Sequence, residues 1–334
     1  MPTGCGEQTM VRVAPSVYAF KYLIAAADLQ EPEIKQLAQT AINNIVSVFS
    51  RQLNYRLRDG SFSVFGSRPG STWLTAFVFG VFSEAEQLLQ NEALQNLENV
   101  NINLDPALYT AFEFLQQKQH ANGCFVEYGY FFQPDLQAFD SSPRSSSLKD
   151  LMLTSYVLSA LLEAPVRLKE TNSQSYANVT DSASRCLLNT VDSFNISQIP
   201  SKALVKVAYT LRRPSEQPGY SETRELVYRE LINRASERDS LRGTLRWWQD
   251  NKRTSPASKV EMTAYAYLAL TEYQPVSQLR PIIRWLLTQQ NERGGFYSPQ
   301  DTVIALRALA HAAAQPHLST GGKAHAQVTA SILP

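Results

Sequence analysis

Apolar side chains recur at three- and four-residue spacing along most of this chain, which is the pattern of helices that bury one face. The clearest stretches cover residues 17–23, 34–49, 73–89, 151–162, 262–270, 282–287 and 303–309. Residues 166–182 and 249–259 are instead rich in polar side chains and are predicted to form surface loops. Proline and glycine are sparse, so the pattern as a whole predicts an all-α chain.

A loose internal repeat organises these helices. A glycine followed by a large apolar residue comes after an amphipathic helix, at Gly60-Ser-Phe62, Gly123-Cys-Phe125, Gly243-Thr-Leu245 with Trp247, and Gly295-Phe296. A more apolar helix then opens near a threonine, at Thr75, Thr154, Thr263 and Thr302. A helix that is apolar on nearly all sides must be buried all round, so we expect the amphipathic helices to cover the apolar ones.

Alternation of the two helix types predicts an α/α toroid, in which an inner and an outer ring of helices share one core. The repeat allows about six helix pairs, and closure of the ring supplies the core because one repeat cannot bury its own face. We expect little β structure. The toroid is expected to span residues 1–313, and residues 314–334 to be a linker or the start of a following module.

Composition narrows the classes of partner. The chain has 334 residues, and its hydrophobic fraction of 44% is enough for a sizeable core. A net charge of +1, with no basic run interleaved with aromatics, argues against nucleic acid as a partner. No apolar stretch approaches the roughly 18 residues that a membrane span needs. No signal peptide precedes Cys5 in this sequence, so Met1 is expected to be a fragment start.

Residues 4–8 read Gly-Cys-Gly-Glu-Gln and carry the most informative chemistry in the chain. Cys5 and Gln8 are three positions apart, a separation that brings side chains together across a turn or one helical turn. The Sγ atom of Cys5 and the Cδ atom of Gln8 can join with loss of ammonia into an internal thioester. The flanking glycines let the backbone curl tightly there. The alternative is a buried cysteine that merely precedes Gln8.

Residues 2–10, Pro-Thr-Gly-Cys-Gly-Glu-Gln-Thr-Met, resemble the thioester signature of the α2-macroglobulin and complement superfamily. Other segments resemble the thioester domain of that family, in the family's order, at residues 52–55, 59–62, 71–77, 260–265, 294–296 and 300–302. The resemblance implies the same toroid fold. It also implies a single-turnover acyl transfer rather than an enzyme, in which a nucleophile attacks the Gln8 carbonyl and releases the Cys5 thiolate, with no cofactor and no metal.

Within the superfamily the chain looks closer to the α2-macroglobulin-like protease inhibitors. These imply a secreted, extracellular protein that couples covalently to amines of target proteases once proteolysis exposes the thioester. The alternative is a complement-like opsonin of innate immunity, which tags nucleophiles on microbial surfaces and then docks a cell-surface receptor. A weaker alternative is a structural domain without a functional thioester. Other domains of the same parent chain are expected partners in each case.

The resemblance also bears on which nucleophile reacts. Hydroxyl-preferring complement homologues use a histidine after the Gly-x-Phe element, and alignment on Gly123-Cys-Phe125 places Gln133 at that position. An amide cannot act as that nucleophile, and no histidine lies between residues 121 and 310, so direct attack by amines is expected. Glu7 could also modulate the thioester, although a plain turn-forming role is the simpler interpretation.

A stored thioester must be shielded from water. The candidate shields are Met10, Tyr18 and the aromatic run of Tyr128, Tyr130, Phe131 and Phe132, with ordinary core packing as the alternative. His120 is expected on a polar turn, and His311 on an apolar helix where it faces the core or caps the helix.

If Cys5 is acylated, Cys124 and Cys186 remain, and their surroundings resemble the positions of an intradomain disulfide in α2-macroglobulin. A disulfide suits a secreted chain, and two unpaired core cysteines are the alternative. Asn178-Val-Thr180 and Asn195-Ile-Ser197 are N-glycosylation sequons, which would make the chain part of a glycoprotein.

Other chemistries are poorly supported. The sequence holds no Cys-x-x-Cys or His-Glu-x-x-His metal pattern, and Gly294-Gly295 lacks the Lys-Ser/Thr of a phosphate-binding loop. A toroid glycosidase would need two carboxylates across a cavity. Glu127, Asp135 and Glu261 could be proposed for that role, but no spacing singles them out.

Overall fold

The computed structural model describes residues 5–26, 31–66, 68–91, 102–129, 143–292 and 294–315. These residues form 12 α-helices and one two-stranded sheet, so the all-α prediction is confirmed. The chain divides into two compact units, of which the first comprises Met1–Val13, Ile42–Ile199 and Arg213–Thr223 and the second comprises Ala14–Ala41, Pro200–Arg212 and Arg224–Pro334. Closure of the helices into a ring stays a prediction.

Two long helices contribute residues to both units. They are α1 (Gly6–Ala26) and α2 (Pro32–Gln52), and a short 3₁₀ turn, η1 (Leu53–Tyr55), follows α2 directly. α1 tolerates Pro15 within its length, and α2 shows the amphipathic pattern read from the sequence.

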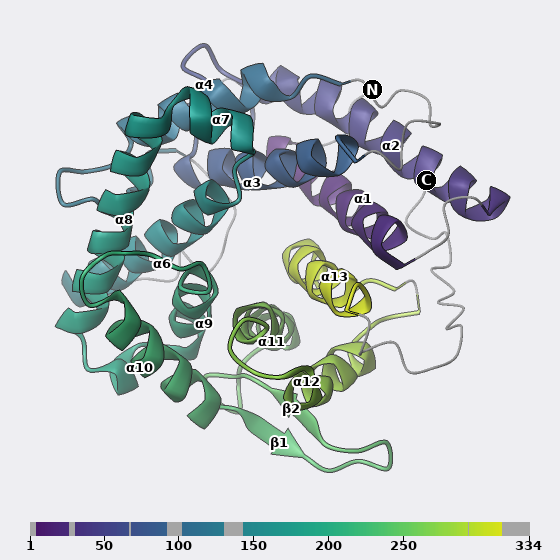
Figure 1. The fold of residues 1–334 in the computed structure, drawn as a ribbon, viewed down its shortest axis with the longest axis vertical. Coiled ribbons are helices and arrows are strands. Elements are labelled where there is room, and N and C mark those ends of the chain that lie inside the picture. The colour runs from purple at the N-terminus through teal and green to yellow at the C-terminus, as the bar shows by residue number, and fades with distance from the viewer. Residues whose placement is uncertain are drawn as a thin grey trace. The chain divides into compact units, whose positions relative to one another are not determined.

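The first unit is built from five further helices: α3 (Thr72–Leu89), α4 (Asp105–Gln117), α6 (Pro143–Leu162), α7 (Val166–Thr171) and α8 (Ser173–Ser193). α3 and α6 lie side by side, α4 packs on α3, and α8 packs on α6 (Figure 1). α3 is buried on nearly all sides, whereas α4 and α8 each bury one stripe. In this unit, amphipathic helices therefore cover apolar ones, as the hydrophobic pattern predicts.

The second unit follows the same plan. Its helices are α9 (Ser201–Thr210), most of α10 (Tyr220–Asn233), α11 (Pro256–Leu270), α12 (Val276–Thr288) and α13 (Pro299–Ala313). α11 lies between α9 and α13 and is buried from Val260 to Leu270 except at Glu261 (Figure 1). The two strands, β1 (Ser236–Arg238) and β2 (Leu245–Trp247), form an antiparallel hairpin, and β2 packs against α12.

The internal repeat has a local physical basis. Each repeat holds a glycine with a left-handed φ, where a side chain would be strained: Gly60 (83°), Gly123 (86°), Gly243 (101°) and Gly294 (77°). A large apolar residue two to five positions after this glycine donates its main-chain N–H to the Oγ1 of a threonine in the next helix. The pairs are Phe62 to Thr75 (2.9 Å), Phe125 to Thr154 (2.9 Å), Trp248 to Thr263 (3.1 Å) and Phe296 to Thr302 (3.0 Å). The tryptophan involved is Trp248 rather than the expected Trp247.

The loop predicted for residues 166–182 is wrong. These residues form α7 and the first half of α8, whose Leu168 and Val179 are buried. Serine and threonine on the helices donate to the carbonyl four residues back, as Thr180 does to Tyr176 (2.9 Å), so polar composition does not prevent helix formation. In the other predicted loop, 249–259, α11 already begins at Pro256 behind the N-cap Ser255.

Candidate functional site

Cys5 lies at the start of α1, in the first unit. Its carbonyl accepts the first intrahelical hydrogen bond from Thr9 N–H (2.9 Å) and a second bond from the Thr9 hydroxyl (3.0 Å), which identifies Cys5 as the N-cap residue. The side chain is 8% exposed, and its thiol forms no disulfide. Gln8 occupies the first turn of the helix and is exposed.

The side chain of Gln8 folds back over this turn. Its Oε1 atom accepts a hydrogen bond from the main-chain N–H of Cys5, at 3.3 Å. A glutamine three residues after the N-cap that reaches back to the N-cap N–H forms one half of a capping box. The carboxamide of Gln8 therefore lies beside Cys5, and the predicted partners share one helical turn.

Gly6 brings the start of α1 close to a neighbouring segment. Its N–H donates to the carbonyl of Val64 (2.8 Å). A Cβ atom at this position would lie 2.6 Å from the carbonyl oxygen of Ser63 and 3.1 Å from Cγ of Tyr55. Real Cβ atoms do not approach so closely, so residue 6 must be glycine for the start of α1 to lie against residues 55–64.

An exposed phenylalanine follows this contact. Phe65 comes directly after Val64 and is 48% exposed, with the Arg68 guanidinium 6.0 Å from its ring centroid. The sequence analysis did not single out Phe65. The hydrogen bond between Gly6 and Val64 brings residue 65 near the start of α1. This contact joins segments far apart in the sequence, so only the tertiary structure reveals it.

Glu127 was considered from the sequence as a glycosidase carboxylate, but it caps a helix. It accepts hydrogen bonds from the N–H groups of Thr72 (2.8 Å) and Trp73 (2.8 Å) at the start of α3, and from Gly129 (2.9 Å). A carboxylate at a helix N-terminus is stabilised by the amides that have no partner within the helix. Glu261, the second such carboxylate, pairs with Lys206 at 3.0 Å.

Several predicted site residues lie outside the described residues: Gln133, Asp135, Tyr130, Phe131 and Phe132. Among the other predicted shields, Met10 and Tyr18 are buried, whereas Tyr128 is 55% exposed. Glu7 is also buried, in the first turn of α1. A side chain on a plain surface turn would be exposed, whereas Glu7 is 3% exposed.

The described histidines are engaged with tyrosines. His120 lies on an exposed turn, with its Nε2 atom 3.1 Å from the hydroxyl of Tyr128. His311 lies in the last turn of α13, with Nδ1 3.5 Å from the hydroxyl of Tyr267. Burial, followed by the positive charge of Lys21, lowers the pKa of His311 below its ordinary value. Both positions agree with the expectations from sequence.

With this geometry in view, comparison with known proteins decides the family. A family model described as the A-macroglobulin TED domain matches residues 1–311. The chain belongs to the A-macroglobulin TED domain family. It is 34% identical to ovostatin of Gallus gallus over 328 residues, a match that covers 93% of this chain and 19% of ovostatin. The TED domain described here therefore spans less than a fifth of that relative's length.

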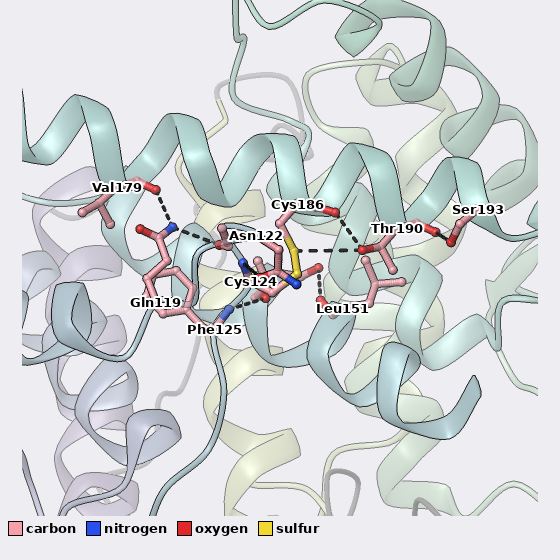
Figure 2. Close-up of a disulfide and its surroundings, with 12 residues drawn as sticks. Gln119, Asn122, Cys124, Phe125, Leu151, Val179, Cys186, Thr190 and Ser193 are labelled. Carbon is pink, nitrogen blue, oxygen red and sulfur yellow. Dashed lines mark hydrogen bonds between the residues drawn. A yellow bond between two sulfur atoms is a disulfide. The ribbon is translucent and has the colours of Figure 1, made fainter. Parts of the chain in front are cut away.

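A disulfide joins two parts of the TED domain in its first unit. Cys124, in the turn before α6, is bonded to Cys186 in the middle of α8, with their Cα atoms 5.3 Å apart (Figure 2). The turn is held further by Gln119, whose Nε2 atom donates to the carbonyls of Gly123 and Val179, each at 2.9 Å. The disulfide and these bonds tie the turn to one face of α8.

Both sequon asparagines of the TED domain are exposed. Asn178 lies within α8 and accepts a bond from Gln174 (3.0 Å). Asn195 lies at the N-cap of η3 (Ile196–Gln198), where its Oδ1 atom accepts from the N–H (3.1 Å) and the hydroxyl (2.8 Å) of Ser197.

Among the described residues of the TED domain, no group of three His, Cys, Asp or Glu side chains could hold a metal ion. No helix formed by the described residues has both the length and the hydropathy to cross a bilayer.

Proposed function

We propose that Cys5 and Gln8 form an internal thioester, and that this TED domain uses it once to couple covalently to an amine of a target protein. The amine attacks Cδ of Gln8, the bond between Cδ and Sγ breaks, and Cys5 leaves as a thiolate. The amine loses a proton to solvent, and the product is an amide at Gln8 with a free thiol at Cys5. One molecule therefore reacts once and does not turn over.

The observation that carries this proposal is the hydrogen bond from Cys5 N–H to Gln8 Oε1, next to a buried thiol that forms no disulfide. It supports a ring closed within one turn, because the acyl group and the thiol belong to the same helix start. A helix N-terminus favours negative charge, so α1 would stabilise the departing thiolate.

The proposed nucleophile is an amine, and the proposed role is protease trapping. Gln133 stands where a hydroxyl-preferring homologue would have its histidine, and His120 is held by Tyr128. Similarity to ovostatin favours a secreted α2-macroglobulin-like parent with further domains. The disulfide and the exposed sequon asparagines suit an extracellular glycoprotein. Target proteases, the other domains of the parent and a cell-surface receptor are the proposed partners.

Intact mass of the full-length gene product tests the proposal. Thioester formation removes one ammonia, about 17 Da, and treatment with methylamine then releases one thiol and adds the amine at Gln8. We expect Cys5→Ala to abolish both changes, while far-UV circular dichroism still reports the helical fold. Methylamine uptake by Cys5→Ala at the wild-type level would refute the thioester. A preference for glycerol over methylamine would instead favour the opsonin.

A further inference from the structure

Residues 52–63 contain an unusual concentration of buried polar atoms without partners. Both side-chain amide atoms of Gln52, the Nε atom of Arg56 and the hydroxyl of Ser63 make no hydrogen bond within the described structure. Gln52 and Ser63 are fully buried. Buried polar groups in folded proteins are nearly always paired. Such a cluster therefore indicates a group that these side chains bind in the working protein.

This segment is the surface on which Gly6 rests. The carbonyl of Ser63 lies against Gly6, and the next residue accepts the Gly6 N–H at 2.8 Å. Ser63 donates its own N–H to the carbonyl of Tyr55 (2.9 Å), which lies in the turn that Gln52 opens. Ser63 thus touches the residue next to the thiol, and Gln52 belongs to the turn paired with Ser63.

The acyl oxygen of the proposed thioester already has one donor. This donor is the N–H of Cys5, which is 3.3 Å from Oε1 of Gln8. When an amine adds to Cδ, the carbonyl electron pair moves to Oε1 and leaves it negatively charged. That charge lasts until the C–O double bond reforms and the thiolate departs. Acyl-transfer sites commonly place several donors around such an oxyanion.

We propose that the Ser63 hydroxyl and the Gln52 amide are the side-chain donors that join the Cys5 N–H in binding the acyl oxygen of Gln8. This inference rests on the proposed thioester and extends it to the residues that speed its reaction. Both side chains can donate, and neither has a hydrogen-bond partner in the described structure, Gln8 Oε1 included. Gln8 is exposed here and the Cys5 thiol is buried, so closure of the ring would draw the acyl group inward, toward these donors. Their burial would strengthen the bonds they give to a charged oxygen.

The test uses Ser63→Ala and Gln52→Met in the full-length gene product, with release of the Cys5 thiol as the readout. We expect methylamine to release the thiol about 100-fold more slowly in each variant, the usual effect of losing one oxyanion donor. Spontaneous hydrolysis should slow by the same factor, because water and methylamine pass through the same oxyanion. A change in access to the site would instead alter the ratio of the two rates.

The chain offers matched controls. The Ser83 hydroxyl and the Gln274 Oε1 atom are also buried without a partner. Ser83 lies in α3 and Gln274 follows α11, so both are outside the segment of residues 52–64 that meets Gly6. Ser83→Ala and Gln274→Met should react at the wild-type rate. Far-UV circular dichroism of each test variant should match that of the wild type, which separates a slower reaction from a loss of the fold.

Each outcome decides the inference. Wild-type rates, within twofold, in both test variants would show that the two groups bind only buried water, and would overturn it. A slower rate in one variant alone assigns the donor to that residue. A folded variant that never loses ammonia supports the inference, because ring closure passes through an oxyanion on the same oxygen. A wild-type protein without the mass loss would refute the thioester itself.

Discussion

Removal of the disulfide between Cys124 and Cys186 should destabilise the first unit by a calculable amount. The perturbation is the double variant Cys124→Ala/Cys186→Ala. Both side chains are buried, so alanine avoids leaving new polar groups in the core. Reduction of the wild-type protein is a poorer test, because an added thiol would also attack a thioester at Cys5.

The magnitude follows from the loop that the crosslink closes. Cys124 and Cys186 are separated by 62 positions in the chain. The chain-entropy relation for a loop of this size gives about 14 cal/mol/K, or about 4 kcal/mol at 25 °C. In the variant the turn keeps the hydrogen bond from the main-chain N–H of Phe125 to Oγ1 of Thr154. The loss of stability should therefore come chiefly from removal of the crosslink.

Amide hydrogen exchange in α8 is the assay. If α8 exchanges through opening of the first unit, a loss of about 4 kcal/mol should speed exchange of its amides about a thousandfold. The control is Cys5→Ala, which removes the third cysteine and keeps the disulfide. Exchange in that control should stay close to the wild-type rate.

A small effect would refute the reasoning. An acceleration of less than about tenfold in α8 would mean that the crosslink constrains the unfolded chain far less than loop closure predicts. An equally large acceleration in Cys5→Ala would mean that the cysteine substitutions act through general destabilisation.

Two further predictions concern a repeat glycine and the buried histidine. Gly60→Ala should cost more than about 3 kcal/mol in urea unfolding, because φ is positive and the new Cβ would lie 2.2 Å from the Thr110 carbonyl oxygen. Gly294 also has a positive φ, but a Cβ added there would have no atom within 4 Å, so Gly294→Ala should cost about 1 kcal/mol. Equal costs in the two variants would show that backbone strain alone, and not the clash with Thr110, sets the loss of stability. Burial and Lys21 lower the pKa of His311 in the folded state, so the unfolded state binds more protons and stability should fall as pH drops below about 6.5. His311→Gln should flatten the dependence of the urea midpoint on pH between 5 and 7, and an unchanged slope would contradict the assignment.

Much of the local structure was predictable from the sequence. The spacing of apolar residues located α1, α2, α3, α6, α11, α12 and α13. A helix that buries one face repeats apolar residues every three or four positions, and this repeat is visible in the sequence. The threonine and glycine positions of the repeat were also visible. The structure was needed to show what the threonine does: its Oγ1 accepts a hydrogen bond from the main-chain N–H of the large apolar residue, as Thr154 does from Phe125.

The misread segment has a physical explanation. Residues 166–182 were predicted as a loop because many of them are polar, although α8 buries seven residues between Val179 and Val191 and packs against α6. The sequence could not assign a role to Glu127, because the helix start that it caps lies 55 residues earlier in the chain.

The sequence by itself determined that Gln8 lies beside Cys5 at the start of α1, because residues three apart meet across one helical turn whatever surrounds them. It determined the helical character of the chain for the same reason, since the period of burial is a local property. Only the tertiary structure decided which residues lie against Gly6, next to the thiol. Ser63 and Tyr55 reach Gly6 across roughly fifty residues of chain, and no local pattern records such a contact. Packing of the core brings these distant segments together, because many weak contacts add up to a large stabilisation.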